Sequence, residues 1–150
     1  MIQQAKTYNL KIPSQTGNLE LIREFISGLA HKVGFNDQDI NKIELAVDEA
    51  CTNVIAHAYN NDENQEIDIS VQMKKDKFTV IVADKGKGFD FNHVEVPNME
   101  KYMAELRVGG LGIYLIKSLM DEVDYKTKAD GKNEVRMTKY MKREKQTRAS

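Results

Sequence analysis

The sequence has 150 residues, of which 41% are hydrophobic and 30% charged, and its formal net charge is −1. This length suits one domain (1–150) with a core of its own, and the composition is typical of a globular protein. The small net charge excludes a strongly basic footprint for nucleic acid or an anionic membrane. Residues 1–12 lack the apolar core of a signal peptide, and no apolar run approaches the length of a membrane span. We expect no direct binding to nucleic acid or membrane.

Cys51 is the single cysteine of the sequence, so it cannot form an internal disulfide. A cytoplasmic protein is therefore the default expectation. Val47, Ala50 and Val54 surround Cys51 at helical spacing, which favours a small core residue. The alternative is a reactive thiol, but no basic neighbour in the sequence would lower its pKa.

The N-terminal half predicts one strand and two helices. Alternating apolar residues predict a strand over 7–12. Apolar residues three and four apart then predict an amphipathic helix from Leu19 to Val33, ended near Gly34. Asn36 or Asp37 is a suitable N-cap for a second helix, which we expect to run to about Tyr59.

The C-terminal half predicts two hairpins with a helix between them. Strands are expected over 67–73 and 78–83, and again over 123–128 and 134–141. Residues 90–108 lack periodicity, as is common in a lid or binding loop, and a helix follows residues 109–112. A charged tail begins at about 142. The fold class that follows is α+β: a two-layer sandwich of a mixed, largely antiparallel sheet with helices on one face.

Glu49, Asn53 and His57 stand four residues apart on the second predicted helix, so their side chains lie on one side of it. The carboxylate and the amide can then reach the same volume above the helix. An ordinary solvated row of polar residues is the alternative interpretation. His57 either contacts a ligand or is a structural histidine.

Two glycine motifs follow in the chain. Asp84-x-Gly86-x-Gly88 ends a predicted buried strand, where an aspartate can accept a hydrogen bond from an exocyclic amine and glycines let the backbone pass close to a flat ring. Residues 109–112 read Gly-Gly-x-Gly before a helix, and free amide groups at a helix N-terminus suit a phosphate. Each motif alone is also typical of an ordinary turn. Neither is a Walker A loop or a dinucleotide fingerprint.

Together and in this order, the three motifs resemble the GHKL, or Bergerat, ATP-binding fold. Within that fold the chain is similar to the small bacterial anti-sigma-factor serine kinases of the RsbW and SpoIIAB type. The resembling stretches are residues 44–59, 82–90, 109–125 and 134–141. They cover most of the chain in the order that the family has.

The resemblance implies a role for each motif residue, with ATP and Mg²⁺ as the cofactors. Asn53 would coordinate a Mg²⁺ ion that bridges the ATP phosphates. Glu49 would be the base that takes a proton from the attacking hydroxyl. Asp84 would bind the adenine amine, and Gly86 and Gly88 would shape that pocket.

The same resemblance places the phosphates at the second glycine motif. Gly110 and Gly112 would lie against them beneath the lid, and Arg107 is a candidate charge stabiliser whose place varies between family members. Many proteins of this fold have a threonine near position 133 that touches a phosphate or its water. Because the residue here is Asn133, we assign it no role.

The implied function is that of an ATP- and Mg²⁺-dependent protein serine kinase. It would phosphorylate an anti-sigma-factor antagonist and bind a sigma factor. A homodimer is plausible by resemblance, with the first strand and first helix as candidate contacts. The alternatives are a nucleotide-dependent binding switch with little turnover, and an ATPase or kinase of the same fold that serves a partner other than a sigma factor.

Overall fold

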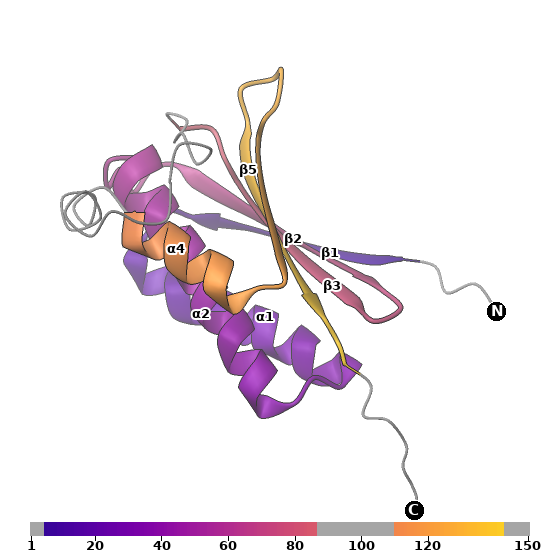
Figure 1. The fold of residues 1–150 in the computed structure, drawn as a ribbon. Helices are drawn as coiled ribbons and strands as arrows, with labels where there is room; N and C mark the ends of the chain where they lie inside the picture. Colours follow the sequence, from indigo (N-terminus) through magenta and orange to yellow (C-terminus); the bar gives the residue numbers. More distant parts are fainter. Residues whose placement is uncertain (1–4, 87–109, 143–150) are drawn as a thin grey trace, which may run out of the picture.

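The structure, a computed structural model, describes residues 5–86 and 110–142 (Figure 1). In chain order its elements are β1 (Lys6–Pro13), a 3-10 turn (Thr16–Asn18), α1 (Leu19–Val33), α2 (Asp37–Asn53), a π-helical turn (Val54–Ala58), β2 (Glu66–Lys74), β3 (Lys77–Asp84), α4 (Gly110–Leu119), β4 (Glu122–Thr127) and β5 (Asn133–Tyr140). The lid expected at about 90–108 lies outside the described residues, as does nearly all of the expected tail. Within the described ranges, no helix is long and apolar enough to cross a membrane.

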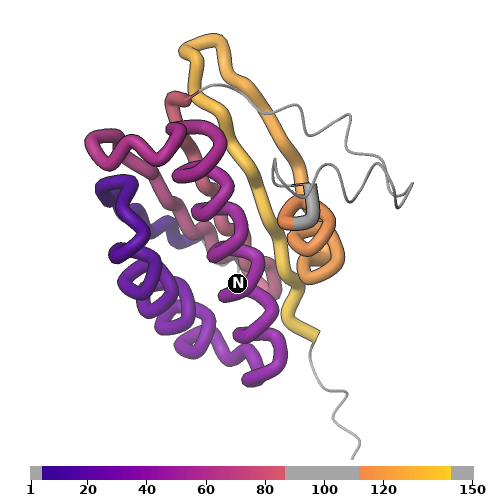
Figure 2. Tube along the Cα trace, turned by 90° about the vertical axis from the view of Figure 1, so that its left-hand side faces the viewer, coloured from indigo at the N-terminus to yellow at the C-terminus, as the bar shows by residue number. Residues whose placement is uncertain are grey.

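The five strands form one sheet in the order β1-β2-β3-β5-β4. Each neighbouring pair of these described strands is antiparallel. Helices α1, α2 and α4 lie side by side against one face of the sheet (Figure 1), and a quarter turn away α1 and α2 stand in front of the strands (Figure 2). The predicted α+β sandwich with helices on one face is therefore confirmed, and its described part is antiparallel throughout.

The core lies between the helices and the sheet. On β2 every second residue faces the helices, and Ile67, Ile69 and Val71 are at most 1% exposed. Ile43 and Val47 of α2 are fully buried against this layer. Burial of such a side chain stabilises the fold by roughly 1.5–3 kcal/mol. The alternation in β2 and the apolar stripe of α2 are the patterns from which both elements were predicted.

Strand β3 is buried along its whole length after Lys77. It is paired on both sides, with β2 and with β5, and it ends at Asp84. This central place agrees with its nearly continuous apolar sequence. Asp84 therefore lies at the end of a central strand, where its carboxylate is buried.

The ends of α1 and α2 follow the predicted signals. Gly34 ends α1 with a φ of 104°, the left-handed conformation that favours glycine at this position. Asn36 caps α2, because its side-chain oxygen accepts a hydrogen bond of 2.8 Å from the backbone amide of Asp39. The two caps fix where the chain turns between the helices.

The expected single helix to about Tyr59 is wrong in one respect. The α-helix ends at Asn53, and residues Val54–Ala58 form a π-helical turn in which the amide of Tyr59 donates to the carbonyl of Val54. A π-turn holds more residues per turn than an α-turn, so His57 does not stand directly above Asn53. The apolar pattern missed this change because Val54 and Ile55 remain buried in either geometry.

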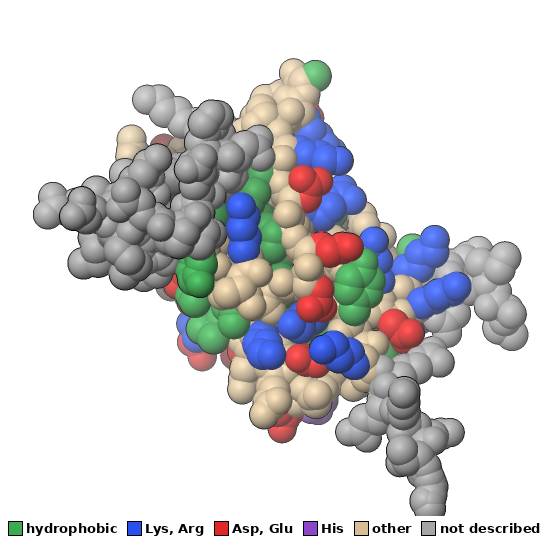
Figure 3. All heavy atoms as spheres, viewed as in Figure 1, with side chains coloured by type: hydrophobic (Ala, Val, Ile, Leu, Met, Phe, Trp, Pro, Cys, Tyr) green, Lys and Arg blue, Asp and Glu red, His purple; other side chains and the backbone are tan. Residues whose placement is uncertain are grey.

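On the face seen in Figure 3, lysine and arginine side chains are interspersed with aspartate and glutamate. This mixture agrees with the formal net charge of −1. A face of mixed sign does not concentrate the positive potential on which binding to a phosphate backbone depends.

Asn36→Ala is expected to lower the free energy of unfolding by about 1 kcal/mol, because the amide of Asp39 loses its cap. Urea denaturation followed by circular dichroism measures the change. Gln38→Ala is the matched control, since Gln38 is an exposed first-turn residue of the same helix. Equal stabilities of the two variants would contradict the capping role.

Candidate functional site

Glu49 and Asn53 lie one turn apart near the C-terminal end of α2, where the first turn of α4 packs against them. A Cβ atom built on Gly112 would lie 2.8 Å from Oε2 of Glu49 and 3.2 Å from Nδ2 of Asn53. A side chain at this position would force the end of the Glu49 side chain to move and the Asn53 amide to shift by a few tenths of an ångström. The structure thus brings the second glycine motif directly onto the Glu-x-x-x-Asn pair.

Glu49 lies in surroundings that favour its protonated form. Burial is the larger cause and the neighbouring carboxylate of Asp48 the smaller one, and both raise the pKa of Glu49 above its ordinary value. Asp48 itself faces Arg23 of α1, with 3.4 Å between its Oδ1 and the Nε of Arg23. A carboxylate with a raised pKa is a stronger base when it is ionised.

Asn53 carries a buried polar atom that the protein does not satisfy. Within residues 5–86 and 110–142, its Nδ2 has no hydrogen-bond partner. Such a group costs about 1–3 kcal/mol when it is left unpaired, so a ligand that paired with it would gain binding energy. The described residues contain no group of three or more His, Cys, Asp or Glu side chains that could hold a metal ion by themselves.

Asp84 ends β3 and is 7% exposed. Its Oδ1 accepts a hydrogen bond of 2.8 Å from the amide of Gly86 and one of 3.1 Å from Nδ2 of Asn133. Burial raises the pKa of Asp84, while the hydrogen bonds from Asn133 and Gly86 lower it in part. Both bonds stabilise the ionised form, and neither involves Oδ2.

Gly86 lies against the π-helical turn. A Cβ atom at this position would collide with the backbone carbonyl of Ala58 and would lie 2.9 Å from its side chain. The glycine of the Asp-x-Gly motif is therefore required by close approach to the protein's own backbone, whereas the sequence analysis expected approach to a flat ring. The neighbour it approaches is the turn that the sequence pattern described as regular helix.

Asn133 is a site residue to which the sequence analysis gave no role. It starts β5, is paired in register with Asp84, and is 8% exposed. Besides Asp84, its Nδ2 donates to the carbonyl of Gly86 at 2.9 Å, and its Oδ1 accepts from Oγ1 of Thr127 at 3.0 Å. The available signal was the antiparallel pairing of β5 with β3, which places the two residues opposite each other.

Asn53, Asp84 and Asn133 line a pocket of about 480 Å³, part of it open to solvent, between α2, α4 and the sheet. The lining residues are Ala50, Asn53, Val54, His57, Ala58, Val82, Asp84, Ile113, Ile116, Tyr125, Asn133, Glu134 and Val135. The walls are mostly apolar, and Asp84, Asn133 and Asn53 are among the few polar groups, as expected for a site that binds a flat apolar body in a fixed orientation.

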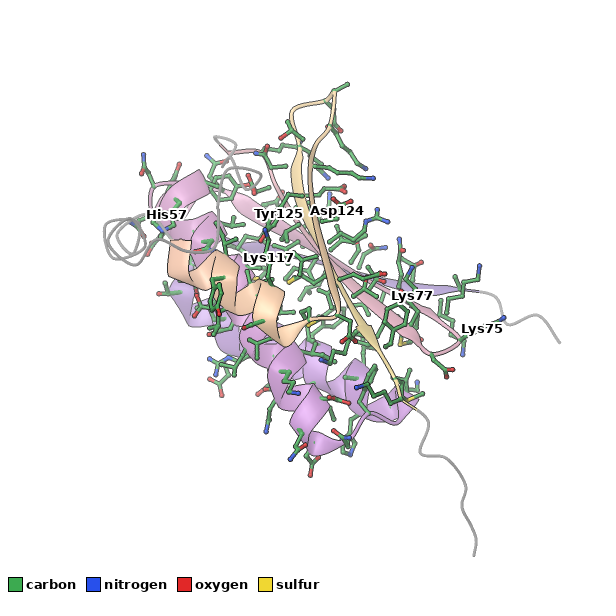
Figure 4. The ribbon with its side chains drawn as sticks, in the orientation of Figure 1. His57, Lys75, Lys77, Lys117, Asp124 and Tyr125 are labelled. Carbon is green, nitrogen blue, oxygen red and sulfur yellow. The ribbon has the colours of Figure 1, made fainter. Side chains whose placement is uncertain are left out.

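His57 and Tyr125 reach the pocket from separate elements, the π-helical turn and β4 (Figure 4). Burial raises the pKa of Tyr125, so its phenol stays neutral. The sequence analysis left the role of His57 open and did not select Tyr125. An alternating strand gives no indication of which tyrosine will face a ligand pocket.

Three predicted site positions cannot be compared with this geometry. Gly88 and Arg107 lie outside the described residues. Gly110 is described only as the first residue of α4. The described part of the site therefore consists of Glu49, Asn53 and Gly112 at one end, and Asp84, Gly86 and Asn133 at the other.

Comparison with known proteins agrees with this arrangement. Residues 12–139 match the family model described as the histidine kinase-like ATPase domain. The chain is 37% identical to the serine-protein kinase RsbW of Bacillus velezensis over 88% of this chain and 84% of that protein. It is also 37% identical to RsbW of Bacillus subtilis, over 94% of this chain and 89% of the relative.

Two solved structures share the fold at low sequence identity. The structure of the RsbU and RsbW domains of a Mycobacterium tuberculosis protein has a TM-score of 0.67 and 16% identity, covering 93% of this chain and 33% of that one. The SiaB–SiaC complex from Pseudomonas aeruginosa has a TM-score of 0.68 and 14% identity, covering 87% and 88%. Both the fold predicted from the motifs and the family that they resemble are confirmed. The chain belongs to the histidine kinase-like ATPase domain family and, within it, to the RsbW serine-protein kinases.

Proposed function

We propose that this protein transfers the γ-phosphoryl group of ATP to a serine of an anti-sigma-factor antagonist, and that it also binds a sigma factor. The observation that carries the proposal is the contact of Gly112 with Glu49 and Asn53 beside the Asp84 pocket. It places a base, an amide and the start of a helix around one volume. The names of the relatives, serine-protein kinases, support the same reaction.

The adenine ring of ATP would occupy the apolar pocket. The Asp84 carboxylate would accept a hydrogen bond from its amine, while Gly86, together with Gly88, would shape the wall. The phosphates would then extend toward the first turn of α4, where Gly110 and Gly112 have no side chains. Arg107 would add positive charge at the γ-phosphate.

Glu49 is proposed as the general base. It would take the proton of the serine hydroxyl while the hydroxyl oxygen bonds to the γ-phosphorus and ADP leaves. Phosphoryl transfer depends mainly on alignment and charge stabilisation, so one positioned base and a few donors suffice. Because the pKa of Glu49 is raised, its carboxylate is a stronger proton acceptor than that of an exposed glutamate.

A magnesium ion fits the donors present. Mg²⁺ is commonly held by one or two protein oxygens together with substrate phosphates, and a side-chain amide supplies one such oxygen. Among the described residues, the Nδ2 of Asn53 has no partner, so it would donate to a phosphate oxygen while Oδ1 of the same amide faces the ion. When bound, the ion would neutralise the charge of the phosphates, and Asn53 would hold it.

The partners and the location belong to the same proposal. A homodimer, an antagonist with the acceptor serine and a sigma factor are proposed because the relatives are RsbW kinases. The structural neighbour SiaB was solved in complex with SiaC, so a protein of this fold does hold a protein partner. The reaction is proposed to take place in the cytoplasm.

The function is tested by incubating the protein with Mg²⁺, γ-labelled ATP and the candidate antagonist. Label on an antagonist serine is the expected result. Bound ATP with no transferred label would favour a nucleotide-dependent switch, and label released as free phosphate would favour an ATPase. The same transfer to a protein unrelated to sigma factors would identify another partner-switching output.

Glu49→Gln is expected to lower the rate of phosphoryl transfer by about 10²–10⁴-fold, because the shape is kept and the base is removed. The affinity for ATP, measured by calorimetry, should change little. Glu44→Gln is the matched control, since Glu44 is a half-buried glutamate five residues earlier on the same helix. Transfer by Glu49→Gln at the native rate would exclude Glu49 as the base.

The rate of transfer should fall on the acidic side as Glu49 becomes protonated. Because the pKa of Glu49 is raised, this acidic limb of the pH–rate profile should lie at a higher pH than it would for an ordinary glutamate. Asp48→Asn removes the smaller of the two causes, so it should move the limb to lower pH without abolishing activity. A pH–rate profile at saturating ATP measures the shift, and a limb that stays in place would contradict the coupling of the two carboxylates.

Gly112→Ala is expected to lower phosphoryl transfer about 100-fold, since the new methyl group displaces the side chains of Glu49 and Asn53 from their positions. Gly28→Ala is the control. Gly28 lies within α1 with no atom near its virtual Cβ, so alanine there should stabilise the protein by about 1 kcal/mol and leave transfer unchanged. Steady-state kinetics and thermal unfolding of both variants separate the two effects.

A further inference from the structure

We propose that Asn133 is a positioning residue for base recognition. Its amide, held by Thr127, fixes the Asp84 carboxylate with one oxygen occupied and the other available, so that the pocket selects a purine with an exocyclic amine. The inference rests on the proposed function, because it concerns how the same pocket reads the base. In this proposal the base is recognised by Asp84 and Asn133 together, and not by Asp84 alone.

The orientation of the Asn133 amide is determined by its contacts. Thr127 donates to its Oδ1 at 3.0 Å, so this atom is the acceptor. The Nδ2 atom then points to two acceptors, Oδ1 of Asp84 at 3.1 Å and the carbonyl of Gly86 at 2.9 Å. The opposite orientation would place the amide oxygen against a carboxylate and a carbonyl, and it is therefore disfavoured.

The two oxygens of the Asp84 carboxylate differ in their hydrogen bonds. Its Oδ1 accepts from both Gly86 and Asn133. None of the described residues donates to Oδ2, and Asp84 lines the pocket. A charged acceptor in a buried site binds an N–H donor strongly, whereas the carbonyl oxygen that guanine has in place of the adenine amine would face it with like polarity.

Asn133 also connects two parts of the fold at this point. Thr127 ends β4 and Asn133 starts β5, so their bond closes the base of the β4–β5 hairpin. Asp84 and Gly86 belong to the turn after β3. The Asn133 side chain therefore connects the β4–β5 hairpin to the turn at residues 84–86. Removing its N–H donors should free the Asp84 carboxylate without changing the apolar residues of the pocket wall.

The test compares the binding of ATP with that of purine riboside triphosphate, which lacks the exocyclic amine, and of GTP. Calorimetry with the native protein should give a preference for ATP of about ten- to 150-fold, the range for a hydrogen bond to a charged group. Asn133→Ala should reduce this preference to a few-fold, mainly by weakening ATP. A merely structural role would weaken all three nucleotides by the same factor.

Two further variants guard against a loss of folding. Asn133→Asp keeps the size and the acceptor for Thr127 but removes both donors, so it too should lose the preference for ATP. Thr127→Val keeps Asn133 and frees its amide, so an intermediate preference is expected. Ser70→Ala is the control, because it breaks an exposed hydrogen bond to Asn9 on the far strands of the sheet and should leave the preference unchanged.

The outcomes separate this inference from the function on which it rests. Native discrimination that persists in Asn133→Ala and in Asn133→Asp would show that Asn133 does not position the carboxylate. Equal binding of ATP and purine riboside triphosphate by the native protein would overturn base reading through Asp84 while leaving the nucleotide site in place. Absence of binding to any of the three would overturn the proposed function itself.

Discussion

The site depends on the close approach of α4 to α2. Gly112 brings the backbone of α4 against Glu49 and Asn53, and a larger residue there would push these two side chains out of their positions. The same two helices are held to the sheet by a shared apolar core, in which Ile43 and Ile116 are at most 1% exposed. The geometry of the polar groups is therefore set by hydrophobic packing, which a flexible polar loop could not supply with equal rigidity.

Stability and function oppose each other in the polar groups at this contact. Burial and Asp48 destabilise the ionised form of Glu49, and Asn53 keeps a buried nitrogen without a partner in the described structure. Each costs free energy in the unliganded protein. Packing in the core offsets this destabilisation of the folded protein. A ligand that paired with these groups would remove it, and the difference would contribute to the binding free energy.

Much of this arrangement could be predicted from sequence, because the patterns are local. The alternation of β2, the apolar stripe of α2 and the glycine at the end of α1 each follow from neighbouring residues. The pairing of Glu49 with Asn53 follows from helical spacing alone. What could not be predicted depends on geometry between distant segments: the π-helical turn that meets Gly86, and the pairing of Asn133 with Asp84, whose positions differ by almost 50 residues.

The role of Asn133 follows from its contacts in the structure and not from the sequence pattern of the family. A departure from the threonine that many proteins of this fold carry gave no reason to assign the residue a role. Its contacts do, because the register of β3 and β5 sets it opposite Asp84 and the hairpin supplies Thr127 on its other side. An amide has two donors on one nitrogen, and here both are used, one on the carboxylate and one on the backbone of the turn. A hydroxyl has a single donor and could not hold both, so this chain fixes the carboxylate by a connection that a threonine cannot make.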